Sequence, residues 1–199
     1  MTAAAALIVV ALTGVRPDHH PAWERVLFDR VNHAELDYRP LRLAQQPGTP
    51  WVLPLTAVDA FAAHRRRLAV QAALALPVEK ALEVGLKRIQ PARRPVQVRP
   101  TTLRDDAPVE GGSFPSGHAA LAAAFAALTS PFLPAELRVL TGATAAVCAV
   151  TRVHQGAHHP VDALGGAFLG IGVGKALAFA VGHDRTRRRG SASAHRSRK

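Results

Sequence analysis

Apolar residues cluster along the chain into six stretches that are typical of helices in a membrane bundle. The longest stretch without a charged residue covers residues 119–135, and residues 163–182 are interrupted only by Lys175. Both are close to the length of about 20 apolar residues that a spanning helix needs. An amphipathic pattern extends one of the shorter stretches through Leu86. The four shorter stretches cover residues 1–15, 51–63, 68–78 and 139–151.

The number of these stretches and their richness in Ala, Leu and Val favour a membrane bundle over a soluble one. Residues 1–15 have no positively charged start and no evident cleavage site, so we interpret them as a first membrane helix rather than a signal peptide. Residues 22–32 carry apolar side chains at helical spacing, which predicts a helix at the membrane interface. Gly166, Gly170 and Gly174 predict a smooth helix face for close packing. The sequence therefore predicts an all-α fold, an integral membrane helical bundle of about six transmembrane helices plus a short interfacial helix.

The formal net charge of +11 is unevenly distributed along the chain. Residues 183–199 contain seven Lys or Arg and one Asp, which gives +6 of that total. Such a run is usually a solvated tail, and it can touch anionic lipid. It has no aromatic residue to stack on bases, so we expect no nucleic-acid partner. We expect a membrane-embedded domain over residues 1–182 and a basic, disordered cytoplasmic tail over residues 183–199.

Basic residues also predict the orientation of the bundle. Residues 64–67 include three Arg in a short turn, and six spans place this turn on the same side as the tail. The positive-inside rule makes that side cytoplasmic, so the loop of residues 87–117 and the turn of residues 152–160 both face outside. The loop is itself basic, which contradicts the rule unless its charges have a function. Its cations are Lys87, Arg88, Arg93, Arg94, Arg99 and Arg104.

Three polar motifs lie in these two outer segments or within two residues of them. They are Lys87 with Arg94 in KRIQPARRP, then Pro115, Ser116, Gly117 and His118, and finally Arg152, His158 and Asp162 in RVHQGAHHPVD. Phosphoryl transfer spreads negative charge over three equatorial oxygens, so its catalysis is largely positioning plus fixed positive charge. Lys87, Arg94 and Arg152 can supply that charge. We expect Ser116 to be the N-cap of a helix that begins near Gly117, so that its hydroxyl and the free amides form an anion site.

Taken together, the three motifs resemble the three-part signature of the type 2 phosphatidic acid phosphatase superfamily. That superfamily includes bacterial acid phosphatases, glucose-6-phosphatase and vanadium-dependent haloperoxidases. The resemblance covers about 75 residues, from Lys87 to Asp162. One departure is Thr151, where the family usually has Ser before the arginine of the third motif, and Thr keeps the hydroxyl.

The resemblance implies that two histidines divide the chemistry. His158 would attack phosphorus and form a phosphohistidine, with Asp162 holding the other ring nitrogen of His158. Pro160 suits the first turn of a helix, which would bring Asp162 close to His158. His118 would protonate the leaving oxygen and then activate water. This mechanism requires a neutral His158 and a protonated His118.

Other interpretations of these residues remain open at this stage. His154, His158 and Asp162 repeat every four residues, which on a continuous helix would align three metal ligands. Pro160 disfavours that zinc site, because a helix running through it would lose a hydrogen bond and kink. A soluble acid phosphatase or haloperoxidase of the same superfamily is a second alternative. A non-enzymatic basic membrane protein explains the tail but leaves the motifs unexplained.

The favoured prediction is a lipid phosphatase in the inner cell membrane, with its active site facing outside the cytoplasm and no metal or cofactor. Its substrate would be a phospholipid or a polyprenyl-phosphate lipid. The resemblance suggests phosphatidic acid, phosphatidylglycerol phosphate, polyprenyl pyrophosphates and polyprenyl-phosphate sugars as candidates. The catalytic residues would be His158, His118 and Asp162, and the phosphate-binding residues Lys87, Arg94, Ser116, Gly117 and Arg152.

Overall fold

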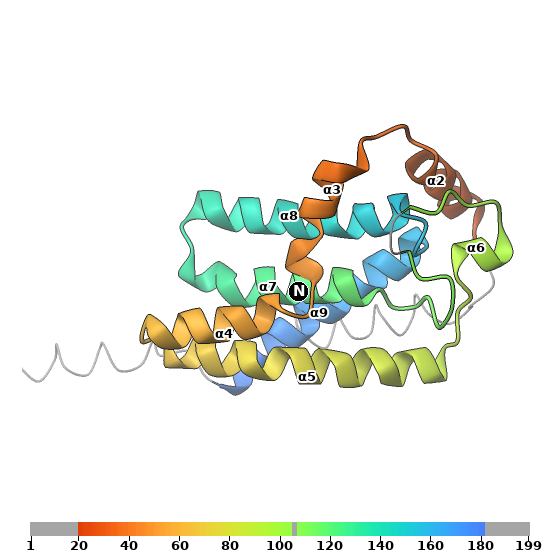
Figure 1. Cartoon of the computed structure of the whole chain (residues 1–199). Coiled ribbons are helices and arrows are strands. Elements are labelled where there is room, and N and C mark those ends of the chain that lie inside the picture. The colour runs from red at the N-terminus through yellow and green to blue at the C-terminus, as the bar shows by residue number, and fades with distance from the viewer. Residues whose placement is uncertain (1–19, 105–106, 182–199) are drawn as a thin grey trace, which may run out of the picture.

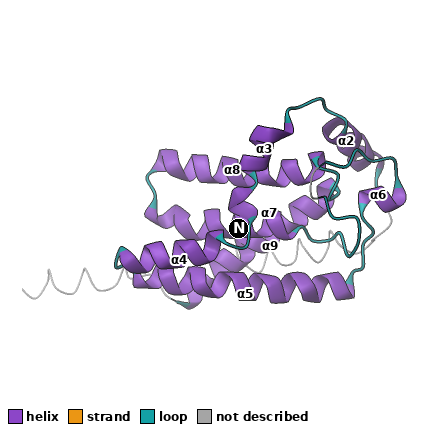
Figure 2. Ribbon diagram, viewed as in Figure 1, coloured by secondary structure: helices purple, strands orange, loops and turns teal. Residues whose placement is uncertain are grey.

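The computed structural model describes residues 20–104 and 107–181, and every regular element in them is helical (Figures 1 and 2). The predicted first span and the basic tail lie outside the described residues. The α-helices are α2 (Ala22–Asn32), α3 (Tyr38–Ala44), α4 (Val52–Ala62), α5 (Arg66–Ile89), α6 (Pro95–Val98), α7 (Gly117–Thr129), α8 (Ala135–His154) and α9 (Pro160–Ala180). Two 3-10 turns, η1 (Gln46–Gly48) and η2 (Ser130–Phe132), complete the described elements.

Helices α7 and α9 form the most extensive helix pair of the bundle. Helix α5 lies along one side of this pair and α8 along the other, while α4 packs against α5 (Figure 1). The core between them is built mainly from Ala and Leu side chains with Phe114. Helices α2 and α3 lie over the far side of α8 (Figure 1). The predicted all-α bundle is therefore confirmed for the described residues.

The α7–α9 pair is close because glycines of α9 face the backbone of α7. A Cβ atom on Gly170 would lie 2.0 Å from the Ala120 carbonyl oxygen, and one on Gly166 would lie 2.2 Å from that of Ser116. Real Cβ atoms do not approach so closely, so only glycine fits at these two positions. The predicted close-packing face is confirmed, and it holds the start of α7 directly against the first turns of α9.

Several predicted helix limits differ from the observed ones for reasons visible in the sequence. The predicted helix at residues 22–32 coincides with α2. The predicted stretch 119–135 breaks at Thr129, because Pro131 lies in the 3-10 turn that follows and Pro134 caps the next helix. Helix α5 continues to Ile89, so Lys87 lies in its last turn rather than in the loop as predicted.

Among the described helices, only α9 is both long and apolar enough to cross a membrane. Helix α4 is apolar but has 11 residues, and α5 carries Lys and Glu side chains in its second half. The predicted count of six spans is therefore not established by length and composition. Large apolar side chains are nonetheless exposed on the outer faces of several helices, among them Leu55, Val58, Phe61, Val70, Leu74, Val139, Leu140 and Val150.

The bundle has two chemically different ends. The turn that carries Arg65 joins α4 to α5 at one end, whereas Lys87 lies at the other end of α5 (Figure 1). The 24 residues of α5 make the helix about 36 Å long. The starts of α7 and α9 and the end of α8 lie at the same end as Lys87 (Figure 1). The three sequence motifs therefore meet at one end of the bundle.

Candidate active site

His158 lies in the short connection between α8 and α9, where it is only 3% exposed. Its Nδ1 atom lies 2.8 Å from the main-chain oxygen of Ser113. A carbonyl oxygen only accepts, so Nδ1 carries the proton and the lone pair of a neutral ring is on Nε2. The main chain of Ser113, two residues before the second motif, therefore determines which nitrogen of His158 can act as a nucleophile.

Asp162 occupies the first turn of α9 and is buried beside His158. Its Oδ2 atom accepts hydrogen bonds from the Ser113 hydroxyl at 2.5 Å and from the His159 backbone N–H at 2.8 Å. The distance from Oδ2 to Nδ1 of His158 is 3.9 Å, which is too long for a hydrogen bond. The direct bond expected between these two side chains is thus replaced by Ser113, which bonds to both residues.

Arg94 is buried and connects three separate segments of the site. Its Nε donates to the Glu110 carbonyl at 2.7 Å, and its two terminal nitrogens donate to the carbonyls of Ala157 at 2.8 Å and Gly112 at 3.2 Å. These bonds use three of the five N–H groups of a guanidinium. Arg94 therefore holds the loop before α7 against the residue preceding His158.

Lys87 reaches the start of α7 through an acidic partner. Its Nζ donates to Glu83 Oε1 at 2.5 Å, and Lys80 forms an ion pair with the other carboxylate oxygen. A Cβ atom on Gly117 would lie 2.6 Å from this carboxylate. Glu83 therefore places a negative group directly against the N-terminus of α7, where the helix favours an anion. A phosphate binding there would share Lys87 with Glu83.

Ser116 is the N-cap of α7, as the sequence predicts. Its backbone N–H donates to the Asp162 carbonyl at 3.0 Å, which joins the start of α7 to the first turn of α9. Its hydroxyl oxygen is buried and has no hydrogen-bond partner among the described residues. An unpaired buried hydroxyl is costly, so this group is suited to a ligand at the helix terminus.

His118 and Arg152 line a common cavity of about 340 Å³. Arg152 is buried, and its Nη1 donates to Gln45 Oε1 at 3.0 Å and to Gln155 Oε1. The neighbouring Thr151 uses its hydroxyl within α8, where it donates to the Val147 carbonyl at 2.8 Å. The cavity lining consists of Arg42, Gln45, Gln46, Thr49, Pro108, His118, Arg152 and Gln155.

The electrostatic environment of His158 follows from this convergence. Burial holds the pKa of His158 well below its usual range, and the positive charges of Arg152, Arg94 and Lys87 lower that pKa further. All three predicted cations therefore act on the same imidazole ring. His158 is neutral at neutral pH, which is the state that a nucleophile requires.

Sequence reasoning did not identify several residues that shape this site. Glu83 could have been found, because it precedes Lys87 by four positions on one helix face. Ser113 and Gln45 gave no such signal, since Ser113 acts partly through its main chain and Gln45 is 107 positions from Arg152.

The alternative zinc site is not formed. Helix α8 ends at His154 and α9 begins at Pro160, so the three candidate ligands do not share a continuous helix. The Nε2 atom of His154 lies 3.1 Å from the Ala34 carbonyl oxygen, away from Asp162. Within residues 20–104 and 107–181, the group with metal-ligand spacing consists of His20, Glu24 and His159.

A family model ties this geometry to a known class of proteins. Residues 66–186 match the model of the PAP2 superfamily, which is more than half of the chain. The protein therefore belongs to the PAP2 superfamily, as the three motifs predict. No curated protein sequence matches the chain.

Two solved structures share the fold. Aquifex aeolicus LpxE superposes with a TM-score of 0.69 and 24% identity, over 82% of this chain and 98% of that one. A transmembrane PAP2-type phosphatidylglycerolphosphate phosphatase from Bacillus subtilis gives a TM-score of 0.71 and 20% identity, over 94% of this chain and 99% of that one. These similarities show that the helical bundle is that of transmembrane PAP2 proteins.

Proposed function

We propose that this protein is an integral membrane phosphatase that removes a terminal phosphate from a lipid through a phosphohistidine on His158. The observation that carries the proposal is the state of His158, which is buried, neutral and oriented by the Ser113 carbonyl. Three cations act on this ring from three different segments of the chain. Such fixed positive charge is what a transferring phosphoryl group requires.

In the first step, the Nε2 lone pair of His158 attacks phosphorus and forms a P–N bond. The bond from phosphorus to the lipid oxygen breaks, and the leaving oxygen takes a proton from His118. Negative charge on the phosphoryl oxygens is stabilised by Lys87, by Arg152 and by the N-terminus of α7 at Ser116. Arg94 contributes charge while it holds the loop in place.

In the second step, His118 removes a proton from a water molecule, which attacks the phosphohistidine. The P–N bond breaks, its electron pair returns to Nε2 of His158, and inorganic phosphate leaves. Asp162 stabilises the ring while it carries positive charge, acting over 3.9 Å and through Ser113. Neither step requires a metal, because protein cations supply the positive charge.

A lipid substrate is supported by the exposed apolar faces of the bundle and by the family. Leu55 and Phe61 on α4 are both 66% exposed, as is common for side chains that contact lipid. We propose about six spans for the whole chain. The candidate substrates are phosphatidic acid, phosphatidylglycerol phosphate and polyprenyl pyrophosphates or phosphosugars.

The direct test is phosphate release by the purified protein from each of these lipids. We expect release in excess EDTA and inhibition by orthovanadate, which mimics five-coordinate phosphorus. Loss of activity in EDTA with recovery on adding zinc would contradict the metal-independent mechanism. Failure to release phosphate from any lipid of the panel would contradict the lipid assignment.

We also propose that the site faces outside the cytoplasm, because residues 64–67 lie at the opposite end of α5. Single cysteines at Val109 and Ala63, both exposed, test this orientation with a membrane-impermeant thiol reagent on intact cells. The native Cys148 is buried and replaced by Ser as a precaution. Labelling should occur at position 109 and not at position 63, and the reverse pattern would place the site in the cytoplasm.

A further inference from the structure

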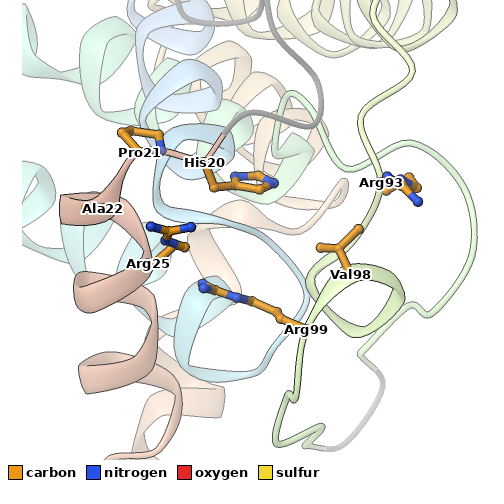
Figure 3. Close-up of a pocket in the computed structure, with 7 residues that line it drawn as sticks. All are labelled: His20, Pro21, Ala22, Arg25, Arg93, Val98 and Arg99. Atoms are coloured by element: carbon orange, nitrogen blue, oxygen red, sulfur yellow. The ribbon is translucent and has the colours of Figure 1, made fainter.

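A second cationic cavity lies beside the candidate active site. Its volume is about 600 Å³, and it lies between the start of α2 and the segment around α6 (Figure 3). Arg25, Arg93 and Arg99 line it together with His20, and none of the lining residues is acidic. Three guanidinium groups around one cavity favour an anionic ligand, above all a phosphate group.

Two buried nitrogen atoms in the lining have no hydrogen-bond partner among the described residues. They are Nη1 of Arg99 and Nε2 of His20. The His20 ring is already fixed, because its Nδ1 lies 3.0 Å from a carboxylate oxygen of Glu24. Arg99 is held by the ring of Phe28, with its guanidinium carbon 4.9 Å from the ring centroid, and its Nη1 lies 3.9 Å from Oδ1 of Asp29 in an ion pair. The guanidinium groups of Arg25, Arg93 and Arg99 therefore supply the N–H donors that a phosphate oxygen can bind in this cavity.

The cavity adjoins the catalytic residues without overlapping the cavity that contains His118. The His20 ring stacks on the His159 ring at a centroid distance of 3.8 Å, and His159 directly precedes α9 and follows His158. The lining residue Arg93 immediately precedes Arg94. A ligand in this cavity would thus lie next to residues that adjoin His158 and Arg94 in the chain, in a cavity separate from the one lined by His118.

The part of the cavity around His20 suits an anion better than a metal ion. His20, Glu24 and His159 could offer three ligand atoms within 4.8 Å of one another. A cation there would, however, be repelled by the arginines, and Glu24 already accepts the Val161 backbone N–H at 3.0 Å. The carboxylate is therefore committed to holding His20 and the first turn of α9.

The position of α2 indicates where the phosphate group comes from. Trp23 is 54% exposed and Leu27 42% exposed, on a helix that also carries the lining residue Arg25. A short helix with exposed aromatic and aliphatic residues is suited to the level of lipid headgroups. At that depth, the phosphate groups of anionic lipids are the most abundant anions near Arg25.

We infer that the cavity lined by His20, Arg25, Arg93 and Arg99 binds the headgroup phosphate of an anionic lipid, as an accessory site separate from the catalytic one. We assign this cavity lipid binding and not hydrolysis, because neither His158 nor His118 belongs to its lining. Bound lipid would hold α2 against the loop that contains Arg94.

The test is calorimetric titration of the protein in neutral detergent with dioctanoyl-phosphatidylglycerol, which has no terminal phosphate to be removed. Parallel titrations use dioctanoyl-phosphatidylcholine and inorganic phosphate. We expect saturable binding of phosphatidylglycerol, weakened at least about tenfold in Arg25→Gln/Arg99→Gln. Arg25→Gln alone changes an exposed residue and should weaken binding about fivefold.

A matched control is Arg30→Gln/Arg39→Gln, which removes the same charge from exposed positions outside the cavity and should bind as the wild type does. Equal weakening in this control would overturn the site. Binding that depends on Lys87 instead of Arg25 and Arg99 would place the lipid in the catalytic site and also overturn it. Tighter binding of inorganic phosphate than of the lipid would contradict the inference that the bound phosphate group belongs to a lipid. Because binding is measured without turnover, the result is independent of the proposed phosphatase activity.

Discussion

The two halves of helix α9 are buried for different reasons. At its start, Asp162 and the preceding His158 and His159 are held by directional hydrogen bonds of 2.5 to 2.8 Å. Further along, Gly170 contacts α7 only through van der Waals packing, with no side chain of its own. The polar half orients groups for chemistry, whereas the glycine half determines how closely two helices approach. Substitutions in the first half should affect activity, and those in the second should affect stability.

The largest effect is expected for the nucleophile. His158→Ala should lower phosphate release by about 10³-fold or more, since it removes the group that forms the covalent intermediate. The variant should remain folded by circular dichroism. His33→Ala, at an exposed position, is the control and should retain full activity. A fully active His158→Ala variant would contradict the conclusion that the polar residues at the start of α9 serve catalysis.

His118→Ala should also lose activity with natural lipids, but for a different reason. Its role is proton transfer, so an aryl phosphate with an acidic leaving group needs it less. With such a substrate, His118→Ala should retain more activity than His158→Ala in the same phosphate-release assay. Equal losses in the two variants on both kinds of substrate would contradict the division of roles.

A smaller effect is expected for Ser113, which bonds to both His158 and Asp162. Ser113→Ala keeps the carbonyl that orients His158 but removes the hydroxyl that donates to Asp162. We expect kcat/KM to fall about tenfold or more, as for the loss of a charge-assisted hydrogen bond. Ser130→Ala, at the other end of α7, should have no effect on kcat/KM.

The glycine half should respond in the opposite way. Gly170→Ala places a Cβ atom 2.0 Å from the Ala120 carbonyl, so the free energy of unfolding should fall by about 1–3 kcal/mol or more. Gly142→Ala on α8 is the matched control, because a Cβ atom there meets nothing within 4 Å. It should be neutral or stabilising by up to about 1 kcal/mol. Thermal unfolding in detergent measures both variants, and equal melting temperatures would show that the two helices are not closely packed.

The smallest effect concerns pH. Burial lowers the pKa of His159 to about 4, and the charge of His20 acts in the same direction. Burial also holds the pKa of His158 well below its usual range. Below pH 6.5 the unfolded chain binds protons that these buried rings do not, so stability is lost as pH falls. Between pH 6.5 and 5, each ring contributes up to about 2 kcal/mol. His158→Ala should show a shallower loss of melting temperature, while His33→Ala should follow the wild type.

The sequence could predict the features of the fold and site that depend on local patterns of residues. Glycines at regular spacing, Pro160 at a helix start and the three motifs are local patterns, and each led to a correct helix position or family. The bond from His158 to Ser113 spans 45 positions, and a main-chain oxygen leaves no trace in side-chain patterns. The six-span count relied on apolar length, whereas α5 carries paired charges such as Lys87 with Glu83. Oppositely charged side chains that pair can lie within a bundle helix. They also lower its mean hydropathy, so that the helix is not recognised as a span.

The most direct measurement is rapid acid-free quenching of the protein during turnover of a ³²P-labelled lipid phosphate, followed by analysis of the phosphoprotein. A base-stable, acid-labile label on the peptide that contains His158, formed in the presence of EDTA, is the predicted result. The label should be absent from His158→Ala and present in His33→Ala. Continued phosphate release without any labelled intermediate, or labelling that persists in His158→Ala, would contradict the proposed mechanism.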